Sequence, residues 1–114
     1  MKQSFTAVLE RNTTLRGNFK TEPYEVAWAN EARWFINTLA IEPGTEIKAR
    51  VQISPDGLNW CDVDGEAQTV SDTGTVSWTT SDFGGWLRLN GDVASGTEDT
   101  QGTAKVQIYL ALKG

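Results

Sequence analysis

The stretch EIKARVQISPDGLNW, residues 46–60, alternates apolar and polar side chains and then enters a turn. Ile47, Ala49 and Val51 share one parity, and charged or polar residues stand between them. Successive side chains of a β-strand point to opposite faces of its sheet, so this alternation predicts an antiparallel strand with one face buried. Ser-Pro-Asp-Gly then supplies a proline with a fixed φ and a glycine that accepts positive φ, so we expect a hairpin turn after the strand.

The same period of two recurs along the whole chain. In AKVQIYLALK, residues 104–113, four aliphatic side chains share one face and Tyr109 lies on the other. Turn signals that contain glycine separate such segments by about 8–12 residues, which is typical of sandwiches and barrels. We therefore predict an all-β fold, a two-sheet antiparallel β-sandwich of jelly-roll-like topology with eight or nine strands. The other segments expected to form strands are residues 4–10, 24–29, 32–41, 74–81 and 85–91.

One of these segments, ARWFINTLAI at residues 32–41, changes its pattern midway. Trp34 and Leu39 are both apolar but differ in parity, so a regular strand would place them on opposite faces. A β-bulge near Asn37-Thr38 would reconcile them, because it shifts the register by one residue. A strand covered on both faces would explain the pattern equally well.

The first 23 residues are harder to assign. After an alternating start, RNTTLRGNFKTEP is polar and interrupted, which fits an extended arm, an edge strand or an ordinary surface loop. An extended arm could clasp a neighbouring molecule by adding a strand to its sheet. By size, residues 1–114 are expected to form one domain, with an exposed polar loop over residues 90–104.

Charge and composition argue against several classes of partner. The hydrophobic fraction of 39% and the charged fraction of 22% are typical of a globular domain. The net charge is −5, and the ten basic residues are scattered, so neither a nucleic acid nor an anionic membrane surface is an expected partner. No apolar run reaches the ~18 residues needed for membrane insertion. The start of the sequence lacks the apolar core of a signal peptide, so a cytoplasmic chain or one carried in an assembly is expected.

The residue content also excludes much catalytic chemistry. There is no histidine, which removes Ser-His-Asp triads, Cys-His pairs and histidine metal sites. Cys61 is the only cysteine, so no disulfide can form within the chain, and we expect a buried, inert thiol. Most aspartates stand beside turn glycines, where their side chains bond nearby backbone N–H groups. We expect no enzyme activity and no cofactor.

Calcium is the one metal for which the sequence offers ligands. CDVDGE places Asp62, Asp64 and Glu66 at alternate positions, and calcium prefers six to eight oxygen ligands. The spacing does not match an EF-hand. The segment therefore fits either a structural calcium site or a solvated acidic turn.

Five tryptophans are the remaining candidates for a binding surface. Exposed aromatic rings can stack on the apolar faces of sugars, and interfaces between proteins are enriched in aromatic residues and arginine. Trp86 is expected on the face opposite Leu87 and beside Arg88, where the pair could contact a sugar or a neighbouring subunit. Trp34 and Tyr109 complete the predicted interface or ligand-binding residues.

Two resemblances bear on function. SPDGLNW resembles the Asp-box of sialidases, but it is one residue shorter and occurs once, so we interpret it as the chemistry of a turn. VQISPDGLNWCDV, GTVSW, GGWLRLNGDV and GTAKVQIYLALKG together resemble small β-sandwich proteins of tailed bacteriophages, the head-decoration or tail-associated proteins, over roughly residues 32–114. This resemblance implies a non-enzymatic module that binds copies of itself or a larger particle.

The predicted function is therefore that of a structural or assembly module, such as a self-associating protein on the surface of a virion or another particle. The predicted partners are further copies of the chain or a larger protein assembly. The alternative is a carbohydrate- or ligand-binding module that uses exposed aromatic side chains, with a glycan as its partner.

Overall fold

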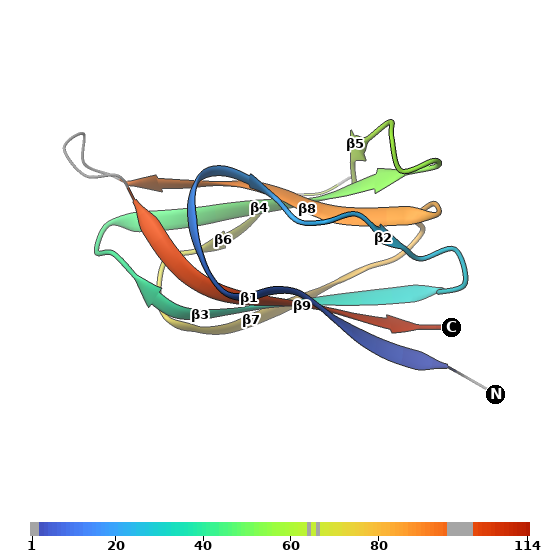
Figure 1. Ribbon diagram of the computed structural model, residues 1–114, viewed down its shortest axis with the longest axis horizontal. Helices are drawn as coiled ribbons and strands as arrows, with labels where there is room; N and C mark the ends of the chain where they lie inside the picture. Colours follow the sequence, from blue (N-terminus) through green and yellow to red (C-terminus); the bar gives the residue numbers. More distant parts are fainter. Residues whose placement is uncertain (1–2, 64, 66, 96–101) are drawn as a thin grey trace.

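The computed structural model describes residues 3–63, 65, 67–95 and 102–114, which fold into strands joined by turns (Figure 1). These residues contain no helix, and so no helix that could span a membrane. The predicted calcium ligands Asp64 and Glu66, and part of the predicted 90–104 loop, lie outside the described residues. The strands are β1 (Ser4–Lys20), β2 (Tyr24–Glu25), β3 (Glu31–Ile41), β4 (Thr45–Ser54), β5 (Cys61–Asp62), β6 (Gln68–Val70), β7 (Gly74–Thr80), β8 (Trp86–Ser95) and β9 (Thr103–Lys113).

The nine strands form one hydrogen-bonded sheet: seven follow the order β5-β4-β8-β1-β9-β3-β7, while β2 pairs with β8 and β6 with β4. Every pair of neighbours is antiparallel. In Figure 1 the path folds into two layers: a β4 layer, with β2, β5, β6 and β8, and a β9 layer, with β3, β7 and the first part of β1. The predicted all-β antiparallel class is confirmed. The layers remain connected through β1, so the sheet is a curled half-barrel.

Strand β1 makes this connection because its two parts pair with different neighbours. Residues 4–16 pair with β9, and residues 17–20 pair with β8. The register shifts twice between Val8 and Thr13, and Asn12 and Gly17 have positive φ angles of 46° and 53°. Bulges and positive φ values bend a strand and increase its twist. These irregularities let one strand leave the β9 layer and enter the β4 layer.

This pairing corrects the prediction for the start of the chain. An extended arm over residues 1–23 is wrong, because residues 4–20 form the longest strand of the fold. The polar, interrupted pattern that suggested an arm reflects the bend instead. The edge-strand alternative fits the pairing, since residues 4–16 pair on one side with β9 and residues 17–20 pair on one side with β8.

The core lies between the two layers and follows the predicted alternation. The inward residues of β4 (Ile47, Ala49 and Val51) are buried, as are the four aliphatic residues of β9. The register of β3 shifts between Thr38 and Ala40, which confirms the predicted bulge one residue further along the chain. The bulge leaves Leu39 exposed.

We expect the bend of β1 to depend on Gly17, because other residues are strained at its φ of 53°. Gly17→Val should lower the free energy of unfolding by about 1–3 kcal/mol, the cost of a left-handed non-glycine residue. Urea denaturation followed by tryptophan fluorescence measures this change. Arg16→Val is the matched control, since Arg16 is exposed, lies in the same strand and lacks positive φ. An equal loss of stability in both variants would contradict this role for Gly17.

Candidate functional site

The turn between β4 and β5 is held by two side chains. The Ser54 hydroxyl accepts hydrogen bonds from the N–H groups of Asp56 and Gly57, at 3.2 and 2.8 Å. One Asp56 carboxylate oxygen accepts bonds from the N–H groups of Leu58 and Asn59, both at 2.8 Å, and the other accepts the Asn59 amide at 2.7 Å. These bonds stabilise the charged carboxylate and hold the pKa of Asp56 well below its usual range. The predicted hairpin is confirmed, and its polar groups are engaged in the turn.

The predicted pair Trp86 and Arg88 lies on the outer face of the β4 layer, half-buried against this hairpin. The Trp86 ring packs on Gly57, where an added Cβ would lie 3.2 Å from it. The Arg88 guanidinium lies 4.1 Å from the centre of the Trp60 ring, a cation–π contact. Arg88 Nε also donates to Gln52 at 2.7 Å, so this guanidinium is already engaged within the chain.

The other predicted interface residues lie elsewhere. Trp34 is buried in the core, and its indole N–H donates to the Thr80 hydroxyl at 2.9 Å. A surface role for Trp34 is therefore wrong. Its hydrogen bond to Thr80 and the stacking of its ring on Trp78 both join β3 to β7. Tyr109 is half-buried on the outer face of the β9 layer, in register with Val8 and Phe35. The four predicted residues thus do not form one site.

Beside Tyr109, a ladder of polar side chains crosses the outer face of the β9 layer. Gln107 donates to Asn12 at 3.0 Å, and Asn37 donates to Gln107 at 2.9 Å. Thr75 donates to Asn37 at 3.0 Å. The ladder therefore joins β1, β9, β3 and β7 through side chains as well as through the backbone.

Two predictions about the β5 segment have different outcomes. Asp62 is exposed, and one of its carboxylate oxygens accepts a bond from the Gln52 amide at 2.9 Å. The described part of the chain contains no group of three residues able to hold a metal ion, and calcium binding stays a prediction because Asp64 and Glu66 lie outside it. The expectation of a buried Cys61 is wrong, since β5 lies at the rim of the sheet and leaves the thiol exposed.

Strand β7 is an edge that sequence reasoning did not single out. It ends the strand path and pairs with β3 in unbroken register from Gly74 to Thr80. Five of its seven residues are exposed, including the partly apolar stretch Thr75-Val76-Ser77. It contains no charged residue, no proline and no bulge, which are the usual means of blocking further pairing at an edge.

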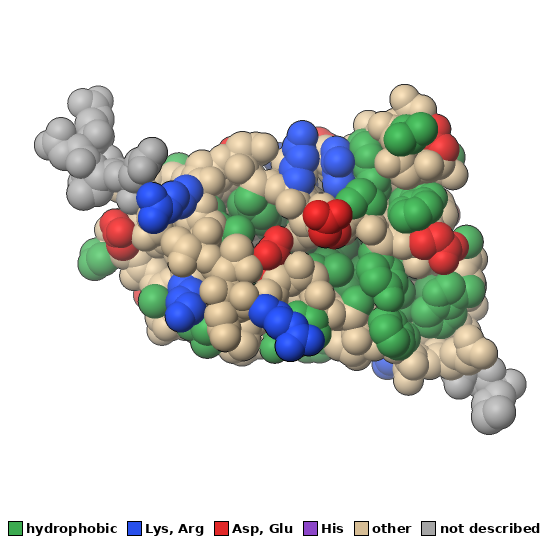
Figure 2. All heavy atoms as spheres, in the orientation of Figure 1, with side chains coloured by type: hydrophobic (Ala, Val, Ile, Leu, Met, Phe, Trp, Pro, Cys, Tyr) green, Lys and Arg blue, Asp and Glu red, His purple; other side chains and the backbone are tan. Residues whose placement is uncertain are grey.

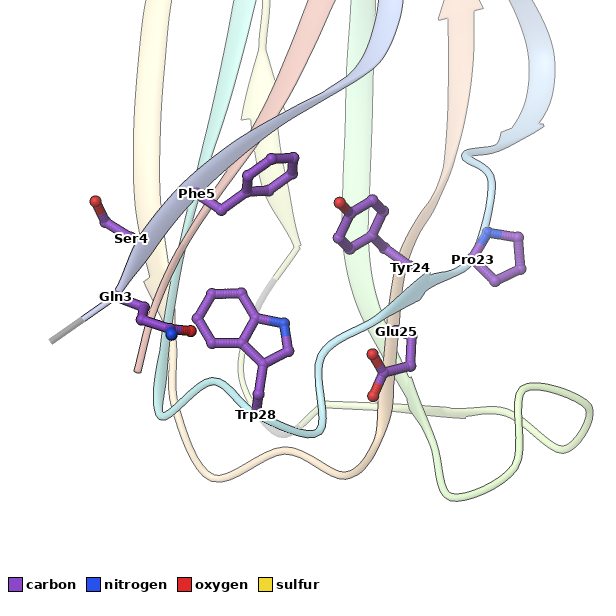
Figure 3. Close-up of a pocket in the computed structure, with 7 residues that line it drawn as sticks. All are labelled: Gln3, Ser4, Phe5, Pro23, Tyr24, Glu25 and Trp28. Carbon is purple, nitrogen blue, oxygen red and sulfur yellow. The ribbon is translucent and has the colours of Figure 1, made fainter. Parts of the chain in front are cut away.

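A groove of about 700 Å³ opens where the first part of β1 faces β2 (Figure 3). Figure 2 shows apolar side chains gathered over this end of the molecule. The groove was not predicted, because Phe5 is far in the sequence from Tyr24 and Trp28, and the path of β1 brings them together. Its lining residues are Gln3, Ser4, Phe5, Pro23, Tyr24, Glu25 and Trp28.

Comparison with known proteins shows the fold. The structure is similar to the PBSX exported protein XepA, with a TM-score of 0.68 and 10% identity, covering 95% of this chain and 36% of that one. It is also similar to the SPBc2 prophage-derived protein YomS, with a TM-score of 0.65 and 9% identity, covering 100% of this chain and 96% of that one. No protein-family model and no curated protein matches the chain. The predicted resemblance to phage proteins is confirmed at the level of the fold.

The hydrogen bonds to Asp56 predict how the hairpin responds to pH. An aspartate has a pKa of about 3.9 in the unfolded chain. When its pKa is lower in the folded protein, the group stabilises the fold fully above the unfolded pKa. This stabilisation is lost as the pH falls through the folded pKa. The Asp56 carboxyl carbon should therefore titrate at a pH well below the ~3.9 of an unpaired aspartate in an NMR titration. Ser54→Ala removes the bond that the Ser54 hydroxyl donates to the Asp56 carboxylate at 3.0 Å, and should raise the Asp56 pKa. Titration of Asp56 near pH 4 in the native chain would contradict this assignment.

Proposed function

We propose that this chain is a non-enzymatic structural module of a phage-related particle, and that it associates with further copies of itself through β7. The observation that carries the proposal is the exposed, uncharged edge of β7. The fold shared with two prophage-encoded proteins supports the particle class.

The two ends of the strand path differ in a way that supports pairing at β7. At the other end, β5 and β6 contain only two and three residues, and short edge strands are a common protection against unwanted pairing. β7 offers seven residues in regular register. A strand from a second copy could therefore extend the β9 layer across the boundary between molecules.

Charge supports the same choice of surface. Each chain has a net charge of −5, so two copies repel one another over most approaches. β7 contains no charged residue, so two β7 strands can pair without repulsion between charges on the strands themselves. A two-fold axis through the paired edges would let each copy present the same strand to the other.

Charging the β7 edge should prevent association. Thr79 is exposed and lies opposite Arg33 in β3, so Thr79→Glu gains a favourable cross-strand partner within the chain. In the proposed complex, the same carboxylate would lie beside the strand of the second copy and disfavour its pairing. Association should weaken by about tenfold or more, which is ~1.4 kcal/mol. Light scattering on a sizing column would show the native chain as an oligomer and the variant as a monomer.

Thr69→Glu is the matched control, because Thr69 is an exposed threonine in β6 opposite Lys48. It changes the net charge equally and should leave the molar mass of the native oligomer unchanged. A native chain that is monomeric at micromolar concentration contradicts self-association. An equal effect of the two variants contradicts β7 as the contact.

A further inference from the structure

The groove between β1 and β2 presents three aromatic rings to one space. Phe5 comes from β1, Tyr24 from β2, and Trp28 from the segment that leads into β3 (Figure 3). The exposed fractions are 51% for Phe5 and 39% for Trp28, high values for such large apolar side chains. The Phe5 and Tyr24 rings are nearly parallel, at 17°, with centres 6.3 Å apart. Ring faces are therefore available to a ligand in this groove.

The Trp28 ring packs against the C-terminal end of the chain at Gly114. Gly114 lies so close to its ring that an added Cβ would stand 2.9 Å from a ring carbon. The Gly114 N–H donates to the backbone carbonyl of Gln3 at 2.9 Å, and the Asn30 N–H donates to Lys113 at 2.8 Å. These contacts fix the ring before any ligand arrives, which lowers the entropic cost of binding.

Polar groups stand beside the rings. Figure 3 shows the Gln3 amide near Trp28 and the Glu25 carboxylate on the opposite wall. One Glu25 oxygen accepts the Ala27 N–H at 3.0 Å, which fixes the side chain, and a carboxylate has further acceptor sites. The combination of apolar ring faces with amide, hydroxyl and carboxylate groups is complementary to a sugar, whose rings have apolar faces and hydroxyl edges.

We propose that this groove is a binding site for neutral oligosaccharides. Its volume of about 700 Å³ lies within the ~300–1,000 Å³ range of small-molecule sites. Among the described residues, its lining includes one carboxylate and no lysine or arginine, so it favours a neutral ligand over an anionic one. The site uses no residue of β7, so it is independent of the proposed self-association.

The direct test is titration of the native chain with chitotriose, cellotriose and maltotriose, followed by NMR. The Trp28 indole signal should shift with at least one of them, while the Trp60 and Trp86 indole signals should not. Trp28→Ala should weaken that binding at least about tenfold, the effect of losing ~1.4 kcal/mol. Leu39→Ala is the control, because Leu39 is 43% exposed and lies at the β3 bulge, outside the groove.

Glu25→Gln provides a second variant if Trp28→Ala does not fold, and it should reduce binding while keeping the rings in place. Failure of all three sugars to bind at millimolar concentration overturns the proposal. Equal binding of an anionic hyaluronan tetrasaccharide, or binding of phosphatidylcholine vesicles without sugar binding, overturns it as well. Thr79→Glu should leave sugar binding intact and Trp28→Ala should leave the molar mass intact, so the two proposals can fail separately.

Discussion

The whole architecture depends on the passage of β1 from one layer to the other. A flat 17-residue strand would extend far past its neighbours, since each residue adds about 3.3 Å. Two register shifts and the positive φ angles at Asn12 and Gly17 bend the strand instead. Because the backbone bonds continue through this bend, the layers are parts of one curled sheet, and their buried faces enclose the core.

The same bend determines which surfaces are left for binding. The first part of β1 pairs with β9 and β2 pairs with β8, so the half-barrel stays open between them, and the aromatic groove lies in that opening. At the far side of the β9 layer, β7 is the last strand among the residues that the structure describes. Two strands separate β1 from β7, so β1 and β7 are about 14 Å apart along the sheet at a strand spacing of ~4.8 Å. The proposed sugar site and the proposed contact with a second copy therefore lie on separate strands.

Regular alternation made much of the fold predictable. The side chains of a strand alternate between two faces, so only one register buries the apolar set of β4. This set, which lies inward, is Ile47, Ala49 and Val51. The bend of β1 was not predictable, since polar and interrupted residues also fit an arm or a surface loop. Trp34 was placed on the wrong face for a related reason. The apolar pattern of residues 32–41 changes parity midway, so the sequence does not decide which face of the sheet the Trp34 ring occupies. The groove residues depend on the bend, so no local pattern could reveal them.

The polar ladder from Asn12 to Thr75 has a mechanical consequence. Its side-chain bonds run across the strands, alongside the backbone bonds, from the bend of β1 to the exposed edge at β7. Tension applied at that edge by an attached neighbour would have to break both sets of bonds to peel β7 away. The ladder thus distributes a pulling force over four strands.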